Sequence, residues 1–234
     1  METNKILEEY KILGMALSIE EEKELFYKYV YATNKLEGNK LTLSQTTQLL
    51  SSDTITGNNI RTSDILEQKG MYKALMRMLK AIREKEALSI ELLLELNWLS
   101  IGNLWKDDNY YVDAKLKGQT EGTFKISQNQ IRITKGGKVL LHQDSLSNPN
   151  NAKENTQNII DTVLKSDKPI IEKAAFLAQE IWLHQPFVDG NKRTGRLLIN
   201  FLTMIEGFPL FVFEDNSSNY NALLVEQYLE KKPG

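Results

Sequence analysis

The stretch that decides the fold runs from Leu183 to Asn200, LHQPFVDGNKRTGRLLIN. An apolar helical pattern leads into it and breaks at Pro186, and a new helical pattern begins near Arg193 or Thr194. The connection, Asp189 to Arg193, holds one glycine, two basic residues and one carboxylate. This pattern predicts two helices joined by a compact, polar turn.

The turn has the chemistry of a phosphate-binding site. Backbone N–H groups of a turn that enters a helix N-terminus converge and carry partial positive charge. Arg193 and Arg196 are three residues apart, so both side chains can reach the same side of the first helical turn. Basic residues at a helix start are unfavourable unless an anion binds there. The sequence therefore favours a bound phosphate.

Two neighbours extend this chemistry. Asp189, a carboxylate in so positive a turn, suggests a divalent cation such as Mg²⁺ that bridges carboxylate and phosphate. His184 is the nearby side chain whose ordinary pKa suits proton transfer near neutrality. The alternative is a glycine turn between two helices, with charged side chains that are merely solvated.

The rest of the chain is predicted to be mainly helical. A capping box, Ser18-x-x-Glu21, opens one helix and Gly38 stands where it should stop. Further 3.6-residue periodicity predicts helices at about 43–50, 62–83, 89–104, 153–165, 170–184, 193–205 and 218–230. We interpret residues 1–234 as one domain, with an N-terminal helical part (about 1–60) and a core (about 61–234).

Residues 122–141 are the exception to the helical pattern. Apolar residues alternate there on both sides of the sequence SQNQ (127–130), at Phe124 and Ile126 and again at Ile131 and Ile133. This alternation predicts a short β-hairpin that turns at SQNQ.

Composition excludes several classes of protein. An apolar share of 41% and a charged share of 26% are typical of a folded chain. With 29 Lys and Arg against 31 Asp and Glu, no broad basic face for nucleic acid is expected. The chain has no cysteine and two histidines, which excludes disulfides, thiolate nucleophiles and a His-rich metal centre. A charged start and the lack of a long apolar run predict a cytoplasmic protein that does not bind membranes.

The stretch from His184 to Arg196 resembles the signature of the Fic (filamentation induced by cAMP) family, H-x-F-x-[D/E]-G-N-x-R-x-x-R. The matching residues are Phe187, Asp189, Gly190, Asn191, Arg193 and Arg196. The resemblance implies a mainly α, single Fic-type domain with a small β-hairpin flap. It also implies a protein adenylyltransferase, which transfers AMP from ATP to a Ser, Thr or Tyr hydroxyl of a target protein, with self-modification as a further outcome.

The resemblance also implies roles for the motif residues. His184 would deprotonate the target hydroxyl, which attacks the α-phosphate and releases pyrophosphate, while Asp189 would hold Mg²⁺. Phe187 would anchor the loop on the helices. The phosphates would be bound by Gly190, Asn191, Lys192, Arg193 and Arg196.

A second motif is similar to the family's inhibitory sequence, [S/T]-x-x-x-E-[G/N]. It is TNKLEGN, residues 33–39, in which Thr33 and Glu37 share one helix face. The resemblance implies that Glu37 pairs with Arg196 and keeps the γ-phosphate from a productive position. This inhibitory helix precedes the core. The alternative is an ordinary solvated acidic helix end.

The resemblance extends to two further regions. The predicted hairpin would be the flap, whose edge pairs with a segment of the target as an added strand. Its docking residues would be Thr123, Phe124, Lys125 and Ile126, although an ordinary surface hairpin is the alternative. Near the C-terminus, Tyr220 or Asn221 would contact the nucleoside.

Two positions depart from the family pattern. Gln185 stands where the family has its histidine, and His184 is one residue earlier, which rotates a helical side chain by roughly 100°. This leaves open a catalytically silent nucleotide-binding regulator. Lys192 replaces the usual glycine and is similar to the Doc branch, which phosphorylates its target. A Doc-like kinase is therefore a second alternative.

Overall fold

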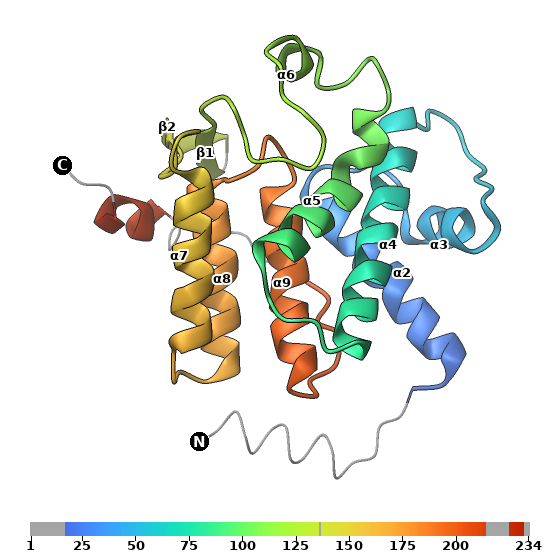
Figure 1. The fold of residues 1–234 in the computed structure, drawn as a ribbon. Coiled ribbons are helices and arrows are strands. Elements are labelled where there is room, and N and C mark those ends of the chain that lie inside the picture. Colours follow the sequence, from blue (N-terminus) through green and yellow to red (C-terminus); the bar gives the residue numbers. More distant parts are fainter. Residues whose placement is uncertain (1–16, 136, 214–224, 232–234) are drawn as a thin grey trace.

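The computed structural model describes residues 17–135, 137–213 and 225–231. It confirms a mainly α fold with one small antiparallel hairpin (Figure 1). The elements are α2 (Ile19–Leu36), α3 (Leu43–Ser52), α4 (Thr62–Arg83), α5 (Ile90–Trp105), α6 (Val112–Leu116), β1 (Gln130–Lys135), β2 (Lys138–Asp144), α7 (Ala152–Lys165), α8 (Ile170–His184) and α9 (Asn191–Ile205). Residues 225–231 are also helical. Within these ranges, no helix is both long enough and apolar enough to cross a membrane.

Helix α9 is central to the architecture. It packs against α8, α4, α5 and α2, while α7 packs on α8 (Figure 1). The hairpin lies at one end of the bundle, near the ends of α7 and α8, and α6 projects from the same end. This end also holds the start of α9, so the loop before α9 is surrounded by elements from the whole chain.

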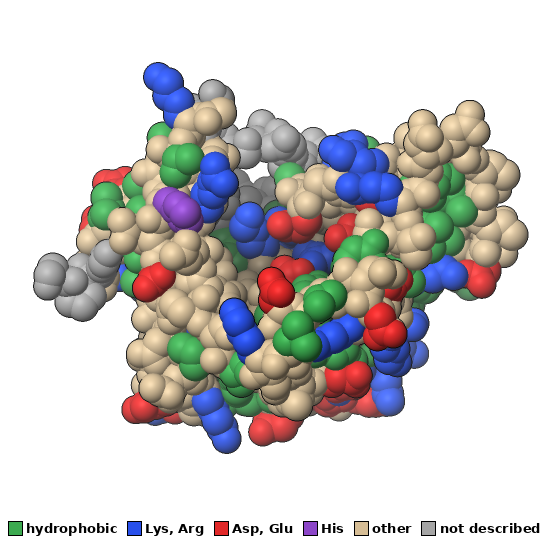
Figure 2. All heavy atoms as spheres, turned by 90° about the horizontal axis from the view of Figure 1, so that it is seen from above, with side chains coloured by type: hydrophobic (Ala, Val, Ile, Leu, Met, Phe, Trp, Pro, Cys, Tyr) green, Lys and Arg blue, Asp and Glu red, His purple; other side chains and the backbone are tan. Residues whose placement is uncertain are grey.

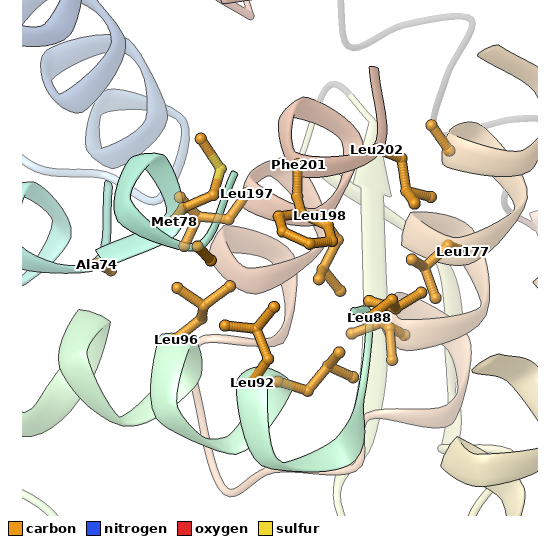
Figure 3. Packing of buried hydrophobic residues seen from close by; sticks show 14 of the residues in the cluster. Ala74, Met78, Leu88, Leu92, Leu96, Leu177, Leu197, Leu198, Phe201 and Leu202 are labelled. Carbon is orange, nitrogen blue, oxygen red and sulfur yellow. The ribbon is translucent and has the colours of Figure 1, made fainter. Parts of the chain in front are cut away.

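The core explains why α9 is held so firmly. Buried side chains from four helices meet around it (Figure 3). They are Ala74 and Met78 of α4, Leu92 and Leu96 of α5, Leu177 of α8, and Leu197, Leu198 and Phe201 of α9. Each of these side chains is at most 3% exposed. Because close-packed interiors shift little, this packing fixes the position of α9 against α4, α5 and α8.

Local sequence signals account for most helix boundaries. Ser18 and Glu21 form the predicted capping box, with the Glu21 N–H donating to Ser18 Oγ at 3.2 Å. Gly38 follows α2 with φ +93°, the left-handed conformation that glycine adopts at low cost. Helices α4 and α8 have their predicted bounds. Helix α9 begins two residues earlier than predicted because Gly190, with φ +75°, serves as its N-cap.

The hairpin prediction was right in kind and wrong in position. The strands pair with Ile131 opposite Gln143 and Lys135 opposite Lys138, so SQNQ is not the hairpin turn. Gly137 has φ +77°, which tight hairpin turns need. Residues 122–129 form no strand. Phe124 stacks on Phe187 instead, with ring centroids 5.9 Å apart, so its apolar character reflects core packing.

The Gln119 side chain shapes residues 122–129, which we call the flap segment because they belong to the predicted flap. Gln119 Nε2 donates to the Phe124 carbonyl at 3.0 Å, and Gln119 Oε1 accepts the Ile126 N–H at 2.9 Å. These bonds satisfy backbone groups that a strand partner would otherwise satisfy. The predicted nucleoside contacts, Tyr220 and Asn221, lie outside the described residues.

Candidate active site

The loop between α8 and α9 is held tightly against α5. A Cβ atom on Gly190 would lie 2.8 Å from Ile101 Cγ2 and 2.9 Å from Asn97 Nδ2, so no larger residue fits there without a shift. Asn97 Nδ2 also donates to the Asp189 carbonyl at 2.8 Å. Glycine is therefore needed both for its positive φ and for this close approach.

Asn191 braces the loop from inside. Its Oδ1 accepts the Phe187 N–H and its Nδ2 donates to the Phe187 carbonyl, each at 3.0 Å. Phe187 itself is fully buried. The Asn191 side chain is thus committed to the loop. Its backbone N–H lies in the first turn of α9, where helical hydrogen bonds leave N–H groups available to an anion.

Arg193 is buried with unsatisfied donors. Its Nη2 lies 3.3 Å from Asp189 Oδ2 and its Nη1 lies 3.8 Å from Glu67 Oε1. Its Nε and Nη1 have no hydrogen-bond partner among the described residues. Buried donors are normally paired, so these two guanidinium nitrogens without a hydrogen bond indicate a missing partner. A phosphate oxygen matches this guanidinium in charge and in geometry.

Arg196 is paired with Glu37 and Thr33, the residues predicted to form an inhibitory motif. Its Nη2 donates to Glu37 Oε1 at 2.5 Å and its Nη1 donates to the Thr33 carbonyl at 3.2 Å. Lys192 Nζ lies 3.8 Å from Glu37 Oε2. The Arg196 side chain is 8% exposed, so this ion pair is shielded from water. One end of α2 therefore occupies the second arginine of the phosphate motif.

Asp189 faces a pocket of about 360 Å³ at the end of the bundle where α9 begins. The lining residues are Glu37, Gly38, Arg61, Ser63, Glu67, Leu104, Tyr110, Tyr111 and Asp189. Seen onto this end, acidic and basic side chains gather around a hollow (Figure 2). Burial, assisted by the Asp189 carboxylate, raises the pKa of Tyr111, so its hydroxyl stays protonated and donates to Asp189 Oδ2 at 2.6 Å.

The residues present fit a magnesium ion that is shared with a nucleotide. Mg²⁺ is commonly bound by one or two carboxylates together with substrate phosphates and water. The Asp189 side chain is 47% exposed, so it can supply one such carboxylate. The described residues contain no group of three or more His, Cys, Asp or Glu suited to a metal. Most ligands would therefore come from phosphate and water.

His184 contacts residues outside the loop. Its Nδ1 lies 2.6 Å from Ser147 Oγ and its Nε2 lies 3.6 Å from Glu180 Oε2. Glu180 also pairs with Lys231. Burial alone would raise the pKa of Glu180, but hydrogen bonds from His184 and Lys231 outweigh it and lower that pKa. The imidazole is thus held in a polar cluster beside the loop.

Gln185 ends α8 in the left-handed conformation, with φ +44°. Its Oε1 accepts a hydrogen bond from Asn129 Nδ2 at 3.2 Å, and the same Nδ2 donates to the Phe187 carbonyl at 2.9 Å. The amide at the family's histidine position therefore ties the loop to the segment before β1.

Lys125, a predicted docking residue, is 2% exposed and makes internal contacts. Its N–H donates to the Pro186 carbonyl at 2.9 Å. Its Nζ donates to Ser145 Oγ and to the Ser147 carbonyl, both at 2.6 Å. Burial lowers the pKa of Lys125 to about 8. The other three docking candidates differ, since Ile126 and Thr123 are exposed and Phe124 packs inward.

The lowered pKa of Lys125 gives a pH-dependence prediction. Between pH 8 and 10 the unfolded chain binds more protons at this lysine than the folded chain, so the folded state gains stability as pH rises. Relative to Lys125→Met, the wild type should gain up to about 2 kcal/mol in free energy of unfolding over this range. Denaturant titrations at both pH values measure it. Lys138→Met, at an exposed strand lysine, is the control, and an equal pH dependence in Lys125→Met would contradict the assignment.

Several site residues had no signal in the sequence. Asn97 of α5, Glu67 of α4 and Tyr111 before α6 reach the loop from distant segments. Each is an ordinary polar residue in its local context. Only the three-dimensional packing shows that they share a site.

Comparisons with known proteins identify the family of this chain. Residues 87–203 match the Fic/DOC family, and the chain belongs to that family. "Protein adenylyltransferase fic-1" of Caenorhabditis elegans is 30% identical over 90% of this chain, which spans 38% of that protein. "Protein adenylyltransferase Fic" of Nematostella vectensis is 25% identical over 86% of this chain and 43% of that protein. The chain thus spans less than half the length of these curated relatives.

Solved structures show the same fold. A Fic domain containing signaling protein from Bacteroides thetaiotaomicron VPI-5482 has a TM-score of 0.76 and 26% identity, covering 97% of this chain and 83% of that one. Fic-1 (residues 134–508) from C. elegans has a TM-score of 0.72 and 24% identity, covering 97% of this chain and 64% of that one.

Proposed function

We propose that this chain is a protein adenylyltransferase held inactive by Glu37. It transfers AMP from ATP to a Ser, Thr or Tyr hydroxyl of a target protein and releases pyrophosphate. The observation that carries the proposal is the buried Arg193, whose guanidinium beside Asp189 has donors left for a phosphate. The names of the relatives support AMP as the transferred group.

Each site residue has a separate role in the proposed AMP transfer. The first turn of α9 and Arg193 bind and orient the phosphates, and Arg196 joins them once Glu37 has left it. Asp189 would hold Mg²⁺, which neutralises phosphate charge when it is bound. The target oxygen attacks the α-phosphorus, the bond to pyrophosphate breaks, and the hydroxyl proton passes to His184.

The role of His184 requires its ring to move. In the resting arrangement the imidazole contacts Ser147 and Glu180. His184 is the last residue of α8, directly before the left-handed Gln185, so the imidazole lies next to the loop. Catalytic hydrogen bonds often form only once substrate is bound, so the resting contacts are compatible with a base.

We also propose that Glu37 inhibits by occupying Arg196. A γ-phosphate oxygen and the Glu37 carboxylate would compete for the same guanidinium. Lys192, which lies near the second Glu37 oxygen, adds to the hold on the carboxylate. For the target protein, we propose docking beside the flap segment, where Ile126 is 44% exposed.

A second candidate is a nucleotide-binding regulator without catalytic activity. It is favoured by the contact of Gln185 with Asn129 and by the direction of the His184 ring, which together leave no base against the loop in the resting arrangement. In this alternative, ATP binding would occur without transfer.

The identity of the transferred group can be tested with ATP labelled separately at the α- and γ-phosphate. AMP transfer deposits the α label on protein and releases the γ label with pyrophosphate. Lys192, similar to the Doc branch, motivates the comparison. Retention of the γ label alone would establish phosphoryl transfer and overturn the proposal, whereas retention of the α label alone supports it.

A further inference from the structure

Tyr111 lines the pocket beside Asp189. It lies in the connection between α5 and α6, and its hydroxyl donates to Asp189 Oδ2 at 2.6 Å. We propose that Tyr111 is a positioning residue for the metal-binding carboxylate, which it orients so that Asp189 Oδ1 takes the cation. This inference rests on the proposed function, in which Asp189 holds Mg²⁺.

The hydrogen bonds of Asp189 distinguish its two oxygens. Oδ2 accepts from Tyr111 at 2.6 Å and from Arg193 Nη2 at 3.3 Å. Among the described residues, Oδ1 accepts from the Gly190 N–H alone, at 2.6 Å. A carboxylate oxygen has two lone pairs. Oδ2 is therefore fully engaged, and Oδ1 keeps one lone pair for a cation.

The position of Tyr111 is itself firmly held. Its ring stacks on Trp105, with centroids 5.3 Å apart and an angle of 27° between the rings. Trp105 is 6% exposed and carries Lys115 Nζ at 5.6 Å from its ring. Tyr111 also has φ +56°, which residues other than glycine rarely adopt. Tyr111 adopts this uncommon backbone conformation at the point where its hydroxyl reaches Asp189.

The expected effect follows from the behaviour of groups that support metal ligands. Hydrogen-bond partners of a ligating carboxylate fix its orientation, and their loss commonly lowers metal affinity about 10- to 100-fold. Competition between Tyr111 and the cation would have the opposite effect. If Tyr111 competed with the cation for Oδ2, removal of its hydroxyl would increase metal affinity. The direction of the change therefore separates positioning from competition.

The test is Tyr111→Phe in a Glu37→Gly background, which removes the hydroxyl and keeps the ring on Trp105. ATP affinity is measured by calorimetry in EDTA and in excess Mg²⁺, and the gain caused by Mg²⁺ is compared. We expect this gain to fall about tenfold or more, with the affinity in EDTA unchanged. Tyr110→Phe, at the neighbouring tyrosine of the same pocket, should keep the full gain. Tryptophan fluorescence and the melting temperature should show that the ring stack persists.

If Mg²⁺ increased the ATP affinity of Tyr111→Phe as much as before, Tyr111 would serve packing alone and the inference would be overturned. A larger increase would also overturn it, because it would show that Tyr111 competes with the cation. Failure of the proposed metal-binding role of Asp189, on which the inference rests, would give a different result. In that case the Glu37→Gly protein with Tyr111 intact would bind ATP without any gain from Mg²⁺, which removes Asp189 as a metal ligand and the inference with it.

Discussion

His184→Ala in a Glu37→Gly background is expected to lower the rate of AMP transfer by about 10² to 10⁴, the usual span for loss of a general base. ATP affinity should stay nearly unchanged, because the phosphates are bound by the start of α9 and the two arginines. Initial rates of α-label incorporation and equilibrium binding of ATP measure the two effects.

His142→Ala is the matched control, since it removes the other histidine from an exposed position on β2. Gln185→Ala should matter far less than His184→Ala. The regulator alternative would hold if the Glu37→Gly protein bound ATP without transfer both with and without His184→Ala, and if His184→Ala altered only stability. Gln185→His, which restores the family spacing, would then be the variant to examine for gained activity.

Glu37→Gly alone is expected to raise self-modification with Mg-ATP by about an order of magnitude or more. The change removes a carboxylate that lies 2.5 Å from Arg196 Nη2. Hydrogen bonds to charged groups contribute about 1.5–3 kcal/mol, and 1.4 kcal/mol corresponds to a factor of ten. Release of Arg196 for the γ-phosphate should therefore exceed tenfold. Label incorporated per minute in wild type and variant measures the effect.

Glu84→Gly is the matched control for this prediction. Glu37 and Glu84 are both glutamates at helix C-caps, of α2 and α4, and Glu84 contacts Lys80 rather than the loop. Glu84→Gly removes a C-cap side chain without removing a contact to Arg196. Self-modification should therefore rise in Glu37→Gly and not in Glu84→Gly. Equal labelling of wild type and Glu37→Gly would disprove inhibition by Glu37.

Periodicity and capping predicted much of the fold because those signals are local. The bounds of α4 and α8 follow from apolar spacing, and Gly38 stands where α2 ends, as predicted. The loop residues were found together because they lie in one stretch of chain. The contact between Glu37 and Arg196, 159 residues apart, could be expected only from the resemblance to a family.

The rest depended on tertiary packing. Alternation at Phe124 and Ile126 looked like a strand, but Phe124 is apolar because it stacks on Phe187. The direction of the His184 ring is set by Ser147, which is 37 residues away and in an irregular segment. Tyr111 is 78 residues from Asp189, and no local pattern marks it. Such contacts become visible only when the helices are assembled.

The most direct test of the central claim is to measure ATP binding and covalent labelling in the same Glu37→Gly sample. The protein is incubated with Mg²⁺ and α-labelled ATP, bound nucleotide is quantified, and the denatured protein is then analysed for retained label and added mass. We predict binding together with covalently attached AMP, at a higher level than in wild type. Binding of ATP with no covalent transfer, in both wild type and Glu37→Gly, would contradict the claim that this chain is an enzyme.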